Sequence, residues 1–151
     1  MSLHIVLIEP EIHTNTGNIG RLSLATASHL HLVKPFGFEL TDKRLKRAGL
    51  DYWQHIELSI YENTEEFFEK NKGRKMAFLS SHGTKDYTEI PYEEDGMLVF
   101  GKESKGLSSD ITDRFKNDLY KIPQYSEHIR SINLANAVAV ITYEGLRQLR
   151  S

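Results

Sequence analysis

The stretch LHIVLIEPEIHTNTGNIGRLSLATASHLHLV, residues 3–33, decides the fold. Its first six residues, Leu3–Ile8, form an apolar, β-rich run that stops shortly before a proline, so we predict a buried strand. A polar loop through residues 16–18 then leads into a helix from Ile19, and a second strand follows at residues 29–33. A strand, a helix and a second strand in this order are typical of a parallel sheet.

The rest of the chain repeats this alternation. Short polar residues mark the predicted helix starts, and glycines mark several helix ends. We therefore predict one α/β domain over residues 1–151, with a mostly parallel sheet flanked by helices. Further strands are predicted at residues 55–61, 75–80, 97–100 and 119–122, and further helices at residues 42–48, 64–71, 108–115 and 131–149.

Composition excludes several classes of protein. The chain has no cysteine, which rules out disulfides, thiolate metal sites and cysteine nucleophiles. Its seven histidines are scattered through the sequence without the His-x-x-x-His pair of zinc hydrolases, so we expect no metal. No apolar run is long enough to cross a bilayer and the N-terminus lacks a signal-peptide pattern, so we expect a cytoplasmic protein.

The overall charge of the chain does not indicate a nucleic-acid partner. The formal net charge is -2 and the sequence pI is about 6.4. A basic segment that includes Lys43, Arg44, Lys46 and Arg47 could still form a local binding face. The alternative is an ordinary solvated helix, which composition alone favours.

In an open parallel sheet ligands bind at the carboxyl ends of the strands, so the loops after strands are the places to look for chemistry. The first such loop runs from Asn15 to Arg21 and holds small polar residues, two glycines and one arginine at a predicted helix start. Exposed amides there suit an anion, and the Arg21 guanidinium offers a planar fork for phosphate. The alternative is a helix cap with a surface arginine.

The second loop is FGKESKGLS, residues 100–108. Two glycines bracket four residues after a strand, as in the phosphate-binding P-loop. Leu107, however, occupies the position at which that motif needs a lysine, so the motif does not support nucleotide hydrolysis by this protein. What remains is a tight loop in which Gly101 and Gly106 allow the main chain to approach a ligand. The alternative is a plain turn between a strand and a helix.

The third loop covers residues 122–137, IPQYSEHIRSINLANA. Ser131 either caps the last helix or presents its hydroxyl to a ligand. Asn133 and Asn136 lie three residues apart on one helical face, and asparagine is a poor helix former whose amide needs partners if it faces the core.

Taken together in this order, the three loops resemble the SPOUT superfamily of RNA methyltransferases, and within it the small tRNA (cytidine/uridine) 2′-O-methyltransferase branch. The resemblance spans nearly the whole chain. Each block alone is weak, but five blocks in order are specific. They are EPEI at 9–12, NTGNIGR at 15–21, KRL with RAGLDY between 43 and 52, FGKE at 100–103, and RSINL at 130–134.

The resemblance implies a fold whose C-terminal segment is threaded into a deep trefoil knot, which ordinary topology rules would not suggest. It also implies a homodimer that binds S-adenosylmethionine in the knotted loops and acts on the wobble nucleotide of tRNA, with an active site at the dimer interface. The counterparts for RNA binding are Arg21, Lys43, Arg44 and Arg47. The counterparts for the cofactor are Leu79, Ser80, Gly101, Glu103, Gly106, Ile122, Ser131, Leu134 and Ala137.

Methyl transfer to a ribose hydroxyl needs stabilisation of the developing alkoxide, because the hydroxyl is a very weak acid. A guanidinium stays protonated in proteins, so we expect Arg21 to grip phosphate and stabilise that charge rather than to act as the base. Asn15 and Asn133 would orient the ribose and the cofactor loop, and Ser131 would hydrogen-bond near the reacting centre. For Glu103, a role in fixing the glycine loop is favoured over attraction of the sulfonium.

Two rival interpretations remain open. One is a non-catalytic RNA-binding or nucleotide-binding module of the same fold, against which the joint presence of Asn15, Arg21, Glu103, Ser131 and Asn133 weighs. The other is 2′-O-methylation of another RNA, such as ribosomal RNA, by an enzyme that would be expected to carry an additional RNA-binding domain.

Overall fold

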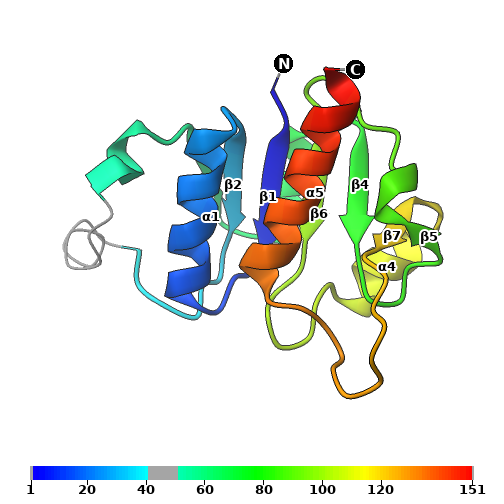
Figure 1. Ribbon diagram of the computed structural model, residues 1–151. Helices are drawn as coiled ribbons and strands as arrows, with labels where there is room; N and C mark the ends of the chain where they lie inside the picture. The colour runs from blue at the N-terminus through cyan, green and yellow to red at the C-terminus, as the bar shows by residue number, and fades with distance from the viewer. Residues whose placement is uncertain (1, 41–50, 151) are drawn as a thin grey trace.

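A parallel β-sheet with helices on both faces forms the molecule, as the computed structural model in Figure 1 shows. The structure describes residues 2–40 and 51–150. The strands are β1 (His4–Ile8), β2 (His29–Val33), β3 (Leu58–Tyr61), β4 (Met76–Leu79), β5 (Lys85–Asp86), β6 (Met97–Phe100) and β7 (Leu119–Lys121). The α-helices are α1 (His13–Ala25), α3 (Thr64–Lys70), α4 (Ser109–Arg114) and α5 (Leu134–Leu149), and the short 3-10 helices are η1 (Asp51–His55), η2 (Tyr87–Glu89) and η3 (Lys116–Asp118).

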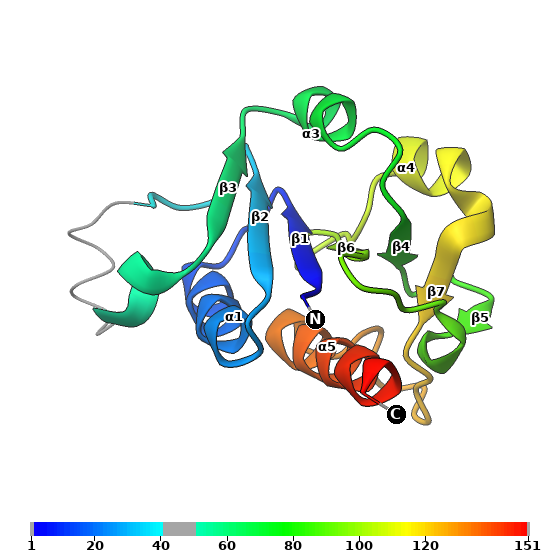
Figure 2. The same ribbon diagram turned by 90° about the horizontal axis from the view of Figure 1, so that it is seen from above.

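The sheet has the order β3-β2-β1-β6-β4-β7-β5, and every neighbouring pair is parallel. Figure 2 shows α1 and α5 on one face of the sheet and α3 and α4 on the other. The chain leaves β1 toward β2 and β3 on one side, and later returns to build β6, β4, β7 and β5 on the other side. The α/β class and the parallel sheet are therefore confirmed.

The central strand β1 is buried on both faces, which explains its uninterrupted apolar sequence. Leu3, Ile5 and Leu7 belong to the core cluster beneath α1 and α5, whereas Val6 and Ile8 belong to the cluster beneath α3 and α4. This alternation follows from the two-residue period of a strand. Full burial of an aliphatic side chain contributes about 1.5–3 kcal/mol, so β1 anchors both layers.

Helix α1 begins at His13, six residues before the predicted start at Ile19, so the prediction of a loop through residues 16–18 is wrong. The N-cap residue Ile12 has no side-chain capping bond. Instead the carboxylate of Glu103 accepts hydrogen bonds from the main-chain amides of Glu11, at 2.8 Å, and Ile12, at 2.9 Å. A partner this distant in the sequence fixes the main chain just before the helix, and local periodicity does not reveal such a partner.

Several other boundaries also differ from the predictions. Helix α5 begins at Leu134, and its N-cap is Asn133, so Ser131 lies outside the helix and does not cap it. Strand β3 begins at Leu58, three residues later than predicted, and His55 belongs to η1 instead. The two-residue strand β5 was not predicted, and the predicted helix at 42–48 lies outside the described residues.

No helix in the described part of the chain combines the length and apolar character required to cross a membrane.

Candidate active site

The carboxyl ends of β6, β4 and β7 bring three loops to one edge of the sheet. Leu79, the last residue of β4, pairs with Phe100 of β6 on one side and with Tyr120 of β7 on the other. The residues that follow these strands, Ser80 and Gly101 among them, therefore start side by side. This is the edge at which parallel sheets bind ligands.

The loop after β6 folds tightly on itself. A Cβ atom added to Gly101 would lie 2.1 Å from the carbonyl carbon of Gly106, so no other residue fits there without displacing the main chain. The main-chain amide of Gly106 donates to the carbonyl of Lys102 at 2.9 Å, and Gly106 has φ +68°, in the left-handed region that favours glycine. Both glycines chosen from the sequence thus have a structural requirement in this loop.

Glu103 and Glu11 tie the loop to the start of α1 by exchanging hydrogen bonds. Glu103 accepts from the amides of Glu11 and Ile12, and Glu11 accepts from the amide and the hydroxyl of Ser104, at 2.8 and 3.0 Å. The Ser104 amide and then the Ser104 hydroxyl lower the pKa of the Glu11 carboxyl. Negative charge at a helix N-terminus is favourable, so this pair fixes both segments.

Asn15 joins α1 to the loop and to the start of α5. Its Nδ2 donates to Glu103 Oε2 at 3.2 Å, and its Oδ1 accepts from Nδ2 of Asn133 at 3.1 Å. Asn133 in turn accepts the amide of Asn136 at 3.2 Å and so caps α5. A chain of side-chain hydrogen bonds, Glu103–Asn15–Asn133, therefore links three elements that are distant in the sequence; we call it the carboxyl-edge cluster.

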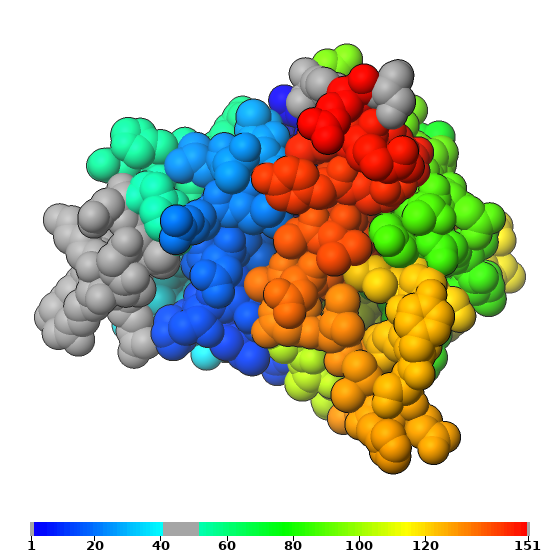
Figure 3. Space-filling model, viewed as in Figure 1, coloured from blue at the N-terminus to red at the C-terminus, as the bar shows by residue number. Residues whose placement is uncertain are grey.

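A groove of about 630 Å³ runs between α1 and α5 beside this cluster. In Figure 3, α1 and α5 lie next to each other on the same face of the molecule. Arg21 is exposed on α1, six residues and so about 9 Å along the axis beyond Asn15. The groove is lined by Asn15, Asn18, Arg21, Leu22, Ala25, Asn133, Ala135, Asn136 and Ala139.

The segment η1 packs on the opposite flank of α1. Tyr52 donates its hydroxyl to the carbonyl of Gly17 at 3.2 Å, and its ring centroid lies 6.0 Å from Cζ of Arg21. Burial raises the pKa of Tyr52. Trp53 covers Gly20 so closely that an added Cβ would lie 2.5 Å from the indole. These aromatic contacts, which the sequence interpretation missed, fix the helix that carries Arg21.

The other predicted cofactor residues fall at the same edge of the sheet. Leu79, Ile122 and Leu134 are partly buried against one core cluster, and Ala137 is half-buried in α5. The hydroxyl of Ser80 accepts the amide of His82 at 3.1 Å. Ser131 is exposed and makes no side-chain hydrogen bond within the described residues. Among the predicted RNA-binding residues, Lys43, Arg44 and Arg47 lie outside the described residues.

Three of the seven histidines are not scattered, which corrects the expectation from the sequence. Ring nitrogens of His4, His29 and His31 lie within 4.8 Å of one another at the amino edge of the sheet. Imidazoles are good zinc ligands, but their lone pairs lie in the ring plane. The His29 and His31 rings stack with centroids 4.2 Å apart and an angle of 15°, so those lone pairs do not converge on one point.

Hydrogen bonds occupy this group, which we call the histidine network. Arg74 donates to Nε2 of His4 at 2.8 Å, so Nδ1 of His4 carries the proton that reaches Nε2 of His31, also at 2.8 Å. Nδ1 of His31 then donates to the hydroxyl of Tyr61 at 2.8 Å. Burial lowers the pKa of all three imidazoles, that of His31 to about 3, so they stay neutral in the folded protein at pH 7.

Comparisons with known proteins agree with this geometry. A tRNA (cytidine(34)-2′-O)-methyltransferase of Methylovorus glucosotrophus is 44% identical over 145 residues, which cover 95% of this chain and 94% of that protein. A solved structure described as giving insight into 2′-OH methylation of C/U34 on tRNA superposes with a TM-score of 0.90, at 41% identity and with 97% of this chain and 95% of that chain covered. An AdoMet-bound rRNA methyltransferase of Sinorhizobium meliloti gives a TM-score of 0.84 at 26% identity, covering 99% of this chain and 57% of that chain.

The parallel sheet and the loops gathered at its carboxyl edge, together with these neighbours, place the chain in the SPOUT class of methyltransferases. Within that class it belongs to the SpoU rRNA Methylase family, whose profile matches residues 2–143. The resemblance drawn from the five sequence blocks is thereby confirmed.

Proposed function

We propose that this chain transfers a methyl group from S-adenosylmethionine to the ribose 2′-hydroxyl of the wobble nucleotide of tRNA, position 34, whether cytidine or a modified uridine. The observation that carries the proposal is the carboxyl-edge cluster Glu103–Asn15–Asn133, which borders an open groove. The chain that carries this cluster is 44% identical to a protein that is named for methyl transfer to the 2′-hydroxyl of cytidine 34 in tRNA.

The residues at the carboxyl edge fit S-adenosylmethionine. Leu79, Ile122 and Leu134 provide a partly buried apolar wall for the adenine ring. Within the described residues, the one hydrogen bond from the main chain of residues 123–132 is that of the His128 amide to the Ser126 hydroxyl, so main-chain groups remain available for a ligand. When bound, the cofactor supplies an already activated methyl group, and the transfer therefore requires no metal.

Arg21 is the residue to which we assign stabilisation of the ribose oxygen. Its guanidinium lines the groove beside Asn18 and can hold the adjoining phosphate through two parallel hydrogen bonds. Negative charge that develops on the 2′-oxygen is then met by a fixed positive charge. The proton leaves through water or a neighbouring group, since a guanidinium does not accept it.

Asn15, Asn133 and Ser131 would position the reactants. The Asn15 amide is held between Glu103 and Asn133, so its orientation is fixed before substrate binds. Ser131 is exposed at the end of the segment that enters α5, where its hydroxyl is available to a ligand. Glu103 fixes the loop that contains Gly101 and Gly106, in keeping with its two main-chain partners.

The C-terminal segment would form the deep trefoil knot of the superfamily. In support, the chain passes from β7 through residues 122–133 to α5, whose cap Asn133 is bonded to α1 next to the loop after β6. These are the segments that a knot around the cofactor would bring together.

A homodimer in the cytoplasm would complete the site. Arg21 is exposed on a single chain, and α1, its N-cap residue and α5 expose four large apolar side chains that a second copy would cover. They are Ile12, Leu24, Val140 and Tyr143, exposed by 44, 39, 41 and 51%. Two copies of the segment with Lys43, Arg44 and Arg47 would then border one groove for tRNA, and binding would weaken as salt rises.

A methyl-transfer assay tests the proposed function. Purified protein is incubated with methyl-labelled S-adenosylmethionine and bulk tRNA, and the modified nucleotide is then mapped. We expect label in the ribose of nucleotide 34. Label in ribosomal RNA alone would favour another RNA substrate, and no label in any RNA would favour a non-catalytic binding module of the same fold.

A further inference from the structure

Tyr125 is an aromatic side chain left almost completely in water. It is 95% exposed, more than any of the other exposed large apolar side chains of the described residues. Other rings of the chain stack in the core, as Phe78 and Phe115 do at 4.3 Å, but Tyr125 takes part in no ring contact, hydrogen bond or cation–π contact within residues 2–40 and 51–150. A ring this exposed gains little from the folding of this chain, because almost none of its apolar surface is removed from water.

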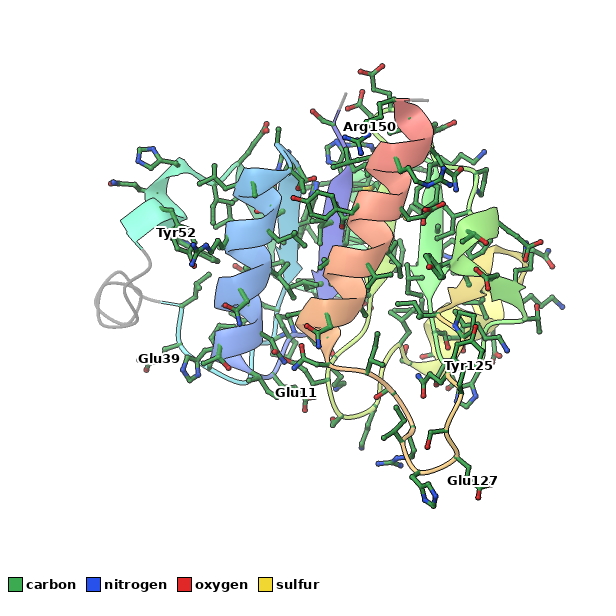
Figure 4. The ribbon with its side chains drawn as sticks, in the orientation of Figure 1. Glu11, Glu39, Tyr52, Tyr125, Glu127 and Arg150 are labelled. Atoms are coloured by element: carbon green, nitrogen blue, oxygen red, sulfur yellow. The ribbon has the colours of Figure 1, made fainter. Side chains whose placement is uncertain are left out.

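The position of Tyr125 relates it to the candidate active site. It lies in the irregular segment 122–133, three residues after Ile122, so its Cα is within roughly 11 Å of the Ile122 Cα even in a fully extended chain. Figure 4 shows Tyr125 and Glu127 on the segment that projects beyond the carboxyl edge of the sheet, the edge at which Glu11 is labelled.

The neighbours of Tyr125 suit a phosphate backbone. Residues 125–131 are all exposed, and they include His128 and Arg130 as donors and Glu127 as the one acidic residue. Single-stranded RNA is recognised by aromatic rings that stack on unpaired bases while nearby cations hold phosphates. Tyrosine is well suited to this role because few rotatable bonds are fixed when its ring is immobilised.

We infer that Tyr125 stacks on an unpaired base of the RNA, next to the nucleotide that is methylated. This rests on the proposed function and adds a specificity-determining contact to it. The contact supplies affinity for RNA and orients the target ribose, and it plays no part in holding the methyl donor. Base–aromatic stacking contributes about 1–3 kcal/mol per base, which corresponds to roughly a 5-fold to 150-fold change in affinity.

A series of substitutions tests the side chain in steady-state methyl transfer to tRNA. Tyr125→Phe and Tyr125→Trp retain a stacking face, and we expect a KM for tRNA within about threefold of wild type. Tyr125→Leu keeps an apolar side chain without a π face and Tyr125→Ala removes it, so KM should rise about tenfold or more in both, with the Kd for S-adenosylmethionine unchanged. Ile129→Ala, on the same segment and 50% exposed, is the matched control.

A fluorescence titration distinguishes contact with RNA from a purely structural role of this side chain. In Tyr125→Trp, addition of an anticodon stem-loop should quench the new indole by more than it quenches Trp53 in wild type. If wild type methylates tRNA and both Tyr125→Ala and Tyr125→Leu retain the wild-type KM for tRNA, the stacking inference is overturned but the proposed function is not. A raised Kd for S-adenosylmethionine in Tyr125→Ala would overturn it in favour of contact with the donor. Absence of methyl transfer by wild type would instead overturn the proposed function.

Discussion

Two polar groups lie at opposite edges of the same sheet, and they differ in how completely the protein satisfies them. In the histidine network at the amino edge, every ring nitrogen of His4, His29 and His31 faces a partner within the chain. At the carboxyl edge, the Glu103–Asn15–Asn133 cluster fixes three segments but borders a groove of about 630 Å³ that carries Arg21.

The difference teaches that a cluster of perturbed titratable groups is not by itself a site. Lowered pKa values and closely spaced imidazoles make the histidine network resemble a functional centre. Each of its ring nitrogens already faces a partner within the chain, however, and two of its rings are stacked. The carboxyl-edge cluster uses its hydrogen bonds to shape loops and leaves a cation and main-chain groups exposed to a ligand.

The largest effect should come from the exposed cation of the groove. We expect Arg21→Lys, which keeps the charge but loses the bidentate grip, to reduce kcat for tRNA methylation by about 100-fold to 1,000-fold, with the Kd for S-adenosylmethionine nearly unchanged. Lys70→Ala, an exposed cation on α3 across the sheet, is the control and should keep full activity. Full turnover by Arg21→Lys would remove Arg21 from the assigned role.

The tight loop at the carboxyl edge offers the next test. Gly101→Ala places a Cβ against the main chain of Gly106 and should lower the free energy of unfolding by about 3 kcal/mol or more, because backbone must move. Gly106→Ala meets no atom within 4 Å and strains only its φ of +68°, so about 1–2 kcal/mol is expected. Urea denaturation would show the order, and equal losses in the two variants would contradict the close approach of the Gly106 main chain to Gly101.

Glu103 connects the loop after β6 to the start of α1, so its replacement tests whether these hydrogen bonds hold the carboxyl edge together. Glu103→Gln presents an amide NH₂ to main-chain donors, so we expect a loss of about 1–3 kcal/mol in stability and a raised Kd for S-adenosylmethionine. Glu127→Gln, an exposed carboxylate on segment 122–133, should change stability by less than about 0.5 kcal/mol. Unaltered stability and cofactor affinity in Glu103→Gln would mean that the loop is held by other contacts.

The smallest effect concerns the histidine network and pH. Burial lowers the pKa of His31 from 6.5 to about 3, so between these values the unfolded chain binds a proton that the folded chain excludes. The stability that a neutral His31 contributes is therefore fully present above about pH 6.5 and is lost as pH falls. For this residue the free energy of unfolding should decrease by about 1.4 kcal/mol between pH 7.5 and 5.5. His31→Gln should flatten the pH dependence of urea unfolding relative to wild type, whereas His128→Asn, an exposed histidine, should not. Identical slopes in wild type and His31→Gln would contradict a neutral, buried His31.

Much of the fold followed from local pattern, because strands and caps are local properties. Strand β2 has the predicted limits 29–33, β6 has the predicted limits 97–100, and Asn63 caps α3 as expected. The start of α1 was missed because the main-chain amides of Glu11 and Ile12, just before the helix, are held by the distant Glu103 and not by a neighbouring residue. The predicted knot stays a prediction, since threading of the chain leaves no mark on residue periodicity.

The candidate site was foreseen as separate residues rather than as one arrangement. Asn15, Glu103 and Asn133 were each selected, yet their mutual hydrogen bonds depend on the sheet order, which brings β6 beside β1. The histidine network was missed although the HLH pattern at residues 29–31 places two imidazoles on one face of a strand. The register that aligns His4 with His29 supplies the third, and a linear sequence does not show that register.

The most direct test of the account is a calorimetric titration of the folded protein with S-adenosylmethionine. The account predicts saturable binding with one molecule per chain, weakened in Glu103→Gln and retained in Arg21→Lys and Tyr125→Ala. No heat and no saturable uptake by wild type, with or without tRNA present, would contradict the claim that the loops at the carboxyl edge of the sheet hold a methyl donor.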